Sequence, residues 1–180
     1  MLTLTVPRAE FFDDEAQEFI TLDAVTLNLE HSLVSLSRWE SKWEKPFLAS
    51  TGKTTEETFG YVEAMSLDGE IPPEVFSRLS NSHLEEINRY INAKMTATWF
   101  AESRPNERSS EIITSELIYY WIAVFNIPLA CEDWHLNRLF TLIKVVNEKN
   151  KPQKKMSQRE LAARNRQLNE QRLREMNTSG

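Results

Sequence analysis

The chain has 180 residues, of which 41% are hydrophobic and 27% are charged, a composition ordinary for a soluble globular domain with one main core. The longest apolar-rich segment, residues 112–127, is interrupted by polar residues and does not reach the roughly 18 apolar residues of a membrane span, so no membrane contact is expected. The first residues lack a secretion signal, and Cys131, the one cysteine, cannot form an internal disulfide. We therefore expect a protein of the reducing cytoplasm.

The charge is unevenly distributed along the chain. Residues 151–180 contain eight basic and three acidic residues, whereas residues 1–150 contain 13 basic and 24 acidic ones. An acidic body therefore carries a basic tail. This division favours folding back of the tail, contact between subunits or an anionic partner, and charge alone does not rank the three.

The N-terminal residues show the alternation of β-strands. The segment LTLTV at 2–6 alternates Leu and Val with threonine, and EFITL at 18–22 and AVTLNL at 24–29 are two further short strand candidates. Between them, residues 13–15 read as an acidic, solvated turn. We predict a small antiparallel β element over residues 1–28.

Helical spacing begins at Leu29, and apolar residues then recur every three or four positions as far as Trp43. The helix is expected to end before Pro46, because the residue before a proline is forced out of helical geometry. Trp39 and Trp43 lie on the apolar face, which is most often buried in a core. If either ring is exposed, it becomes the leading contact for a partner protein.

Further helices are predicted from caps, prolines and apolar spacing over residues 54–67, 73–79, 83–93, 109–126 and 129–150. The helix over 109–126 is apolar around most of its circumference, which indicates a central place in the core or in an interface. Residues 95–110 are the least regular part, and Trp99 and Phe100 there are expected in a short strand or an anchored loop. Residues 29–150 together form the predicted helical core domain.

A basic helical tail is predicted over residues 151–180. Ser157 followed by Glu160 is a capping-box pattern that starts a helix with few apolar residues. Residues 149–176 contain no aromatic residue for stacking on bases, so nucleic acid is not expected as the partner. The candidate contacts of the tail are Lys154, Lys155, Arg159, Arg164 and Arg166. The predicted fold class is thus mainly α, with a helical domain, a small N-terminal antiparallel β element and a C-terminal helical tail.

No residue pattern indicates catalysis, a metal or a cofactor. The segment GKTT at 52–55 lacks the preceding strand and the first glycine of a phosphate-binding loop. Cys131 and His135 are four residues apart, but two ligands make a poor metal site, and no orienting group for a nucleophile is evident. We predict a protein that is not an enzyme and has no catalytic residues, metal ligands or cofactor.

Several segments in the same order resemble one protein family. The segments LEHSLVSLSRWESKWEKPFL, MTATWF, ITSELIYYWIAVFNIP, EDWHLNRLFTLIKVVNEKN and PQKKMSQRELAARNRQLNEQRL are similar to the tail assembly chaperones of long-tailed bacteriophages that infect Gram-positive bacteria. The resemblance covers nearly the whole chain.

The resemblance implies a protein of viral morphogenesis in the host cytoplasm that binds the tape measure protein, keeps it soluble and promotes assembly of the tail tube protein around it. It also implies a longer form of the same chaperone made by ribosomal frameshifting, and homo-oligomers are a further expectation. Apolar grooves between helices would suit such a client. The candidate client-binding residues are Trp39, Trp43, Phe47, Trp99, Phe100 and Trp134. Two alternatives are a structural virion component, such as a head-to-tail connector or tube-associated protein, and a nucleic-acid-binding adaptor that uses the tail.

Overall fold

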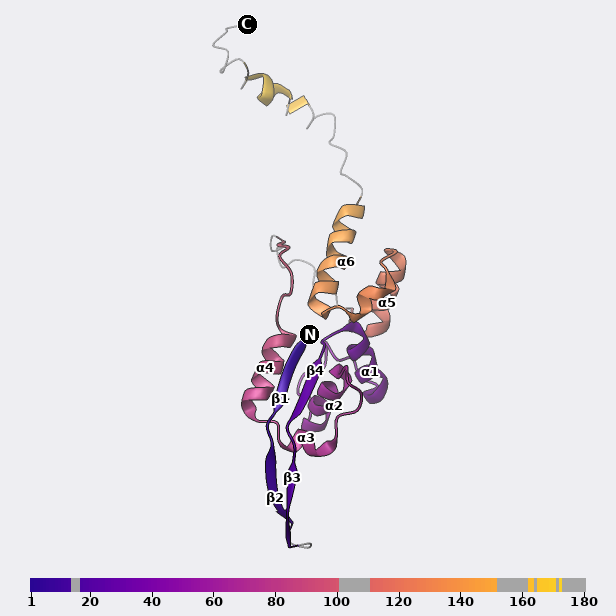
Figure 1. Cartoon of the computed structure of the whole chain (residues 1–180). Helices are drawn as coiled ribbons and strands as arrows, with labels where there is room; N and C mark the ends of the chain where they lie inside the picture. Colours follow the sequence, from indigo (N-terminus) through magenta and orange to yellow (C-terminus); the bar gives the residue numbers. More distant parts are fainter. Residues whose placement is uncertain (14–16, 101–110, 152–161, 164, 171, 173–180) are drawn as a thin grey trace. The chain divides into compact units, whose positions relative to one another are not determined.

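The chain is mainly helical and carries an antiparallel β element at its N-terminus, which confirms the predicted fold class. Its computed structural model describes residues 1–13, 17–100, 111–151, 162–163, 165–170 and 172 (Figure 1). The chain divides into two units, Met1–Asn147 and Glu148–Gly180. In the second unit, the described residues from 162 to 172 are helical.

The β element is a two-stranded ribbon. Strand β1 (Leu2–Val6) pairs antiparallel with β4 (Val25–Leu29), and β2 (Ala9–Asp13) pairs antiparallel with β3 (Glu18–Leu22). Two residues separate the two pairs on each strand of the ribbon, so the cross-strand register continues unchanged from one pair to the other. The strand predictions at 2–6, 18–22 and 24–29 are confirmed, whereas β2 was not predicted, since its adjacent phenylalanines do not alternate with polar residues.

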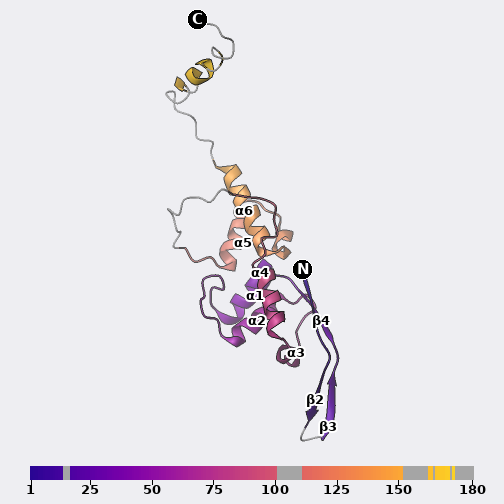
Figure 2. The same ribbon diagram turned by 90° about the vertical axis from the view of Figure 1, so that its left-hand side faces the viewer.

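Arg78, the residue that follows α3 (Pro73–Ser77), is bonded to the ribbon where the two strand pairs meet. Its Nη1 donates to the carbonyl oxygens of Pro7, Leu22 and Asp23 at 3.1, 3.3 and 2.9 Å. Both views show β2 and β3 extending beyond the helices from this point (Figures 1 and 2). Residues 9–13 and 17–22 are named the arm below.

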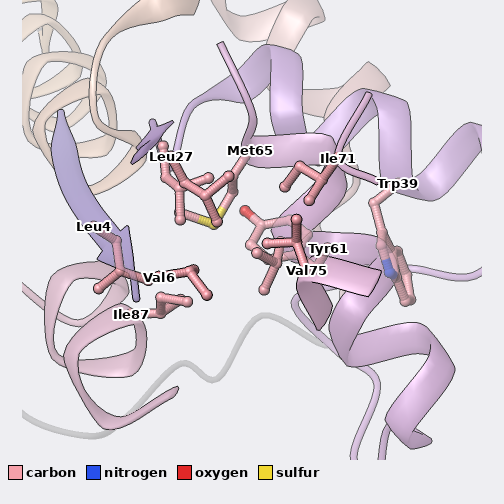
Figure 3. Close-up of a cluster of buried hydrophobic side chains, with 11 residues drawn as sticks. Leu4, Val6, Leu27, Trp39, Tyr61, Met65, Ile71, Val75 and Ile87 are labelled. Atoms are coloured by element: carbon pink, nitrogen blue, oxygen red, sulfur yellow. The ribbon is translucent and has the colours of Figure 1, made fainter. Parts of the chain in front are cut away.

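The first core lies between β1 and β4 and four helices: α1 (Leu33–Trp43), α2 (Thr55–Met65), α3 and α4 (Asn81–Ile91). Alternate strand residues point into it, as period-two spacing requires. Figure 3 shows these side chains meeting those of the helices; the buried set includes Leu4, Val6, Leu27, Trp39, Tyr61, Met65, Val75 and Ile87. The outward positions of the ribbon here are polar, namely Thr3, Thr5, Thr26 and Asn28, so the apolar residues of β1 and β4 share the face toward the helices.

Helix α1 takes part in both cores. A capping box of Ser32 and Ser35 starts it, and Glu44, with a positive φ of 53°, ends it two residues before Pro46. Its Trp39 belongs to the first core, whereas Leu33 and Leu36 belong to the second. The prediction of a helix that ends before Pro46 is confirmed.

The second core joins α1 to α5 (Ser115–Val124), the 3-10 helix η1 (Leu129–Asp133) and α6 (Leu136–Asn150). The single helix predicted over 129–150 is wrong, because His135 forms a β-bridge with Ser32 and Leu136 N–H donates to the His31 carbonyl at 2.7 Å. The helix predicted over 109–126 begins at Ser115, where Thr114 caps it; residues 111–114 are not helical, and residues 109–110 lie outside the described residues.

No helix in the described part of the chain combines the length and the apolar character needed to cross a membrane.

Candidate functional site

His135 and Cys131 were weighed as a metal or nucleophile pair, and both are buried. The Asn137 N–H donates to His135 Nδ1 at 3.3 Å, so Nε2 carries the proton and donates to the Tyr90 carbonyl at 3.0 Å. Both ring nitrogens are occupied, which leaves neither as a base toward Cys131. Within the described ranges, no three His, Cys, Asp or Glu side chains are grouped to hold a metal ion.

His31 lies at the junction of the two cores. Its Nδ1 is 2.5 Å from the Tyr61 hydroxyl, and its ring centre is 5.1 Å from that of His135. Burial lowers the pKa of His31 to about 4, and the neighbouring His135 acts in the same direction. His31 is therefore neutral near pH 7 and serves packing and hydrogen bonding.

Trp39 is fully buried in the first core. Its indole Nε1–H donates to the Glu57 carbonyl at 2.8 Å, which satisfies the one polar atom of the side chain. The ring has no surface for a client in this fold, and its contribution is to stability.

Trp43 and Phe47 are only partly buried. Trp43 packs over Gly60, where a Cβ atom would lie 3.0 Å from the indole Nε1, so glycine permits the contact. Phe47 stacks on Tyr61 with ring centres 3.8 Å apart, and its N–H donates to Glu40 Oε1 at 2.8 Å. Both residues combine a core contact with an accessible edge.

The other candidate aromatics lie on the surface and are covered by cations. Trp99 is 83% exposed, and Lys94 Nζ lies 4.6 Å from its ring centre. Lys144 Nζ lies 4.2 Å from the ring of Phe100, and the Arg138 guanidinium lies 4.1 Å from that of Trp134. Phe100 and Trp134 are half-buried, so Trp99 is the most accessible of the six predicted residues.

Of the predicted tail contacts, only Arg166 falls on the described part of the chain, where it is helical and exposed. Lys154, Lys155, Arg159 and Arg164 lie outside the described residues.

A small apolar cavity opens between α2 and α4. Its volume is about 240 Å³, and the lining residues are Phe47, Lys53, Thr58, Tyr61, Val62, Leu84, Ile87, Asn88 and Ile91. Lys53 is the one charged residue in this lining; its Nζ lies 4.3 Å from the Phe47 ring and donates to the Ser50 carbonyl at 2.9 Å. Burial lowers the pKa of Lys53, while Glu57 partly opposes the shift. The cavity is smaller than the roughly 300–1,000 Å³ of pockets for drug-sized ligands, and it suits a single side chain.

Helix α5 is apolar on two sides, and the second core covers only one. Ile118 and Ile122 are buried, whereas Tyr120 and Val124 are 61% and 57% exposed. Leu117 and Trp121, at the spacing that completes one helical stripe with them, are half-buried. Ile112 and Leu129 extend this surface at its two ends. The exposed stripe is named the α5 surface below.

The arm exposes large apolar side chains on both of its faces. Phe12 and Phe19 face each other across the strands with ring centres 5.1 Å apart, and Phe11 and Ile20 form the pair on the opposite face. Their exposed fractions range from 46% for Ile20 to 73% for Phe19. An isolated two-stranded ribbon is marginally stable in water, so such a surface is typical of a binding element.

The α5 surface and the arm were not among the residues singled out from the sequence. The spacing of Leu117, Tyr120, Trp121 and Val124 carried the first signal, because it defines a second stripe beside Ile118 and Ile122. For the arm, the signal was two apolar pairs, residues 11–12 and 19–20, on either side of an acidic turn.

Comparison of the chain with protein-family models, with curated proteins and with solved structures gave no match.

Proposed function

We propose that this protein is a tail assembly chaperone of a long-tailed bacteriophage, which binds the tape measure protein in the host cytoplasm and keeps it soluble while the tail tube protein assembles around it. The observation that carries the proposal is the α5 surface, a stripe of apolar side chains on a well-packed helix in which Tyr120 and Val124 are more than half exposed. The ordered sequence segments that resemble this family support the same conclusion.

The α5 surface suits an apolar helix better than a charged ligand. Between Ile112 and Cys131 the only charged residue is Glu116, at the N-terminal end of α5, where its carboxylate accepts local hydrogen bonds that lower its pKa. An amphipathic client helix could therefore lie along α5 and bury its apolar stripe without leaving a charge unpaired. Covering such stripes removes the surface that drives aggregation of a long helical protein.

The proposal includes no catalysis and no cofactor, since holding a client soluble requires only reversible contact. The longer frameshifted form of the chaperone and the tail tube protein are the further partners that the family resemblance implies. A structural role in the virion is the alternative that the following experiment separates.

The test is co-expression with apolar helical fragments of the tape measure protein from the same phage. We expect the chain to move a fragment into the soluble fraction and to co-purify with it. The double variant Tyr120→Asp, Val124→Asp should fold with nearly the wild-type melting temperature but leave the fragment insoluble, because two charges on the stripe must be desolvated in the complex. The control Thr51→Asp, Asn81→Asp adds the same charge at exposed positions away from α5 and should retain the activity.

Fragments that all stay insoluble beside folded wild-type protein would overturn the chaperone proposal. Recovery of the protein in stoichiometric amounts from purified mature particles would then support the virion component instead.

A further inference from the structure

The α5 surface ends beside exposed carboxylates, and we infer that it takes an amphipathic helix whose apolar stripe ends in a lysine or arginine. That basic residue lies over the N-terminal end of α5, next to Glu116. The inference rests on the proposed function, because it names the class of client helix that the α5 surface binds.

Glu116 continues the exposed stripe of α5 toward its N-terminal end. It is exposed and lies one helical turn before Tyr120, which itself lies one turn before Val124. A hydrogen bond from its own backbone N–H is the main cause of the lowered pKa of Glu116, and Thr114 adds to the shift. A client helix that covers Tyr120 and Val124 therefore meets an ionised carboxylate one turn further along.

An open hollow adjoins Glu116 between the C-terminal end of α1 and the segment before α5. Its volume is about 350 Å³, and the lining residues are Glu40, Ser41, Glu44, Lys45, Pro46, Thr114 and Glu116. Both oxygens of Glu40 accept backbone hydrogen bonds, and Lys45 Nζ is bonded to Glu57. Within the described ranges, the Glu44 side chain has no hydrogen bond or ion pair. The hollow therefore offers the carboxylates of Glu44 and Glu116 to a cation brought in by a partner.

The charge along this part of the chain distinguishes between kinds of partner. Residues 111–137, which include α5 and η1, contain four acidic residues and no lysine or arginine. Such a border repels an acidic helix and the phosphates of a nucleic acid, whereas a basic residue at the edge of an apolar contact is attracted to it. A basic amphipathic helix is therefore the partner that matches both the stripe and its border.

The two features of the surface have different roles in binding. Apolar burial on Tyr120 and Val124 supplies most of the affinity, because an exposed charge pair contributes little. The charge pair selects among apolar helices and sets their direction, since the basic end of the client lies over Glu116 and the other end over Leu129.

The experiment measures the binding of two designed helical peptides to the full chain by isothermal titration calorimetry. The peptides share one leucine stripe and differ at a single position one turn beyond it, which is lysine in one peptide and glutamate in the other. We expect the wild type to bind the lysine peptide about 3- to 10-fold more tightly at low salt. The preference should disappear in about 1 M salt, whereas both peptides should continue to bind through the leucine stripe.

Reversing one charge on the protein identifies the residue responsible. Glu116→Lys should invert the preference, so that the glutamate peptide binds more tightly. Glu85→Lys makes the same charge change at an exposed position of α4 and should keep the wild-type preference. Because the preference is a ratio of two affinities for the same variant, a small loss of stability in Glu116→Lys cancels from it.

The inference is overturned if the wild type binds both peptides equally at low salt, or if Glu116→Lys and Glu85→Lys show the same preference. The chaperone proposal survives either result, since the leucine stripe still binds. Failure of both peptides to bind the wild type would instead overturn the inference together with the assignment of the α5 surface to the client.

Discussion

The two halves of the β ribbon have the same pairing geometry and opposite environments. In β1 and β4 the apolar residues occupy one face and Thr3, Thr5, Thr26 and Asn28 the other. One layer of helices buries Leu4, Val6, Leu27 and Leu29 and partly covers Leu2 and Val25. In β2 and β3 both faces are apolar, and Phe11, Phe12 and Phe19 remain about half exposed or more. The comparison teaches that a change in side-chain pattern along one continuous register is enough to turn a buried strand pair into one whose apolar side chains stay exposed.

The helices repeat the same contrast. Helix α1 divides its apolar residues between two cores and leaves none of the large ones fully exposed, whereas α5 places Ile118 and Ile122 in a core and leaves Tyr120 and Val124 uncovered. The arm and the α5 surface are therefore two places in the described part of the chain where several neighbouring apolar side chains remain uncovered.

The largest expected effect comes from truncating matched aliphatic residues in the two ribbon halves. Leu4→Ala should lower the free energy of unfolding by about 2–5 kcal/mol, because it leaves a cavity in the first core. Ile20→Ala, on the exposed arm, should change it by less than about 0.5 kcal/mol. Urea unfolding measures both, and a comparable loss in the two variants would contradict the distinction between a covered and an uncovered half.

Lowering the pH should have an intermediate effect on the free energy of unfolding. We assign this effect to the covered half of the ribbon, β1 and β4, because His31 lies two residues after β4. The pKa of His31 is about 4 in the folded protein and about 6.5 when unperturbed. The unfolded chain therefore binds more protons between these values. Stability is fully present above about pH 6.5, falls as the pH falls, and is lower by about 2 kcal/mol near pH 5.

His31→Gln provides the control for this pH dependence. The free energy of unfolding of this variant should vary less between pH 7 and pH 5 than that of the wild type. The Glu57 carboxylate also makes the protein sensitive to acid, but at lower pH, because its hydrogen bond to Lys45 is the main cause of its lowered pKa. Equal slopes for the two proteins would show that His31 is not buried in its neutral form.

An effect of similar size is expected at Glu40, the buried carboxylate of α1 that is bonded to the backbone of Phe47 and of Ser115. Its Oε1 accepts from the Phe47 N–H and its Oε2 from the Ser115 N–H, at 2.8 and 2.7 Å. Glu40→Gln leaves one oxygen for two backbone donors, so stability should fall by about 1–3 kcal/mol. Glu85→Gln, at an exposed position of α4, should be nearly neutral in the same unfolding assay.

The sequence predicted those parts of the fold in which local pattern and final environment agree. Period-two alternation identified β1 and β4, and the caps and prolines identified α1 through α4, because these signals reflect local geometry. The break between η1 and α6 could not be predicted, since it depends on a hydrogen bond from Leu136 to His31, more than a hundred residues away.

The candidate site was predicted less completely for the same reason. Aromatic residues identify possible anchors, but whether a ring is buried depends on packing: Trp39 has no exposed surface, while Trp99 is 83% exposed. Lys53 gave no signal in sequence, because its place at the cavity mouth depends on Phe47 and Ser50 in the folded loop.

The most direct measurement of the central claim, that the α5 surface binds the client, is amide hydrogen exchange with and without a soluble tape measure fragment. The claim predicts that the fragment slows exchange of residues 115–124 in α5 and leaves exchange in the arm unchanged. Protection of the arm by the fragment, with α5 unchanged, would contradict the claim.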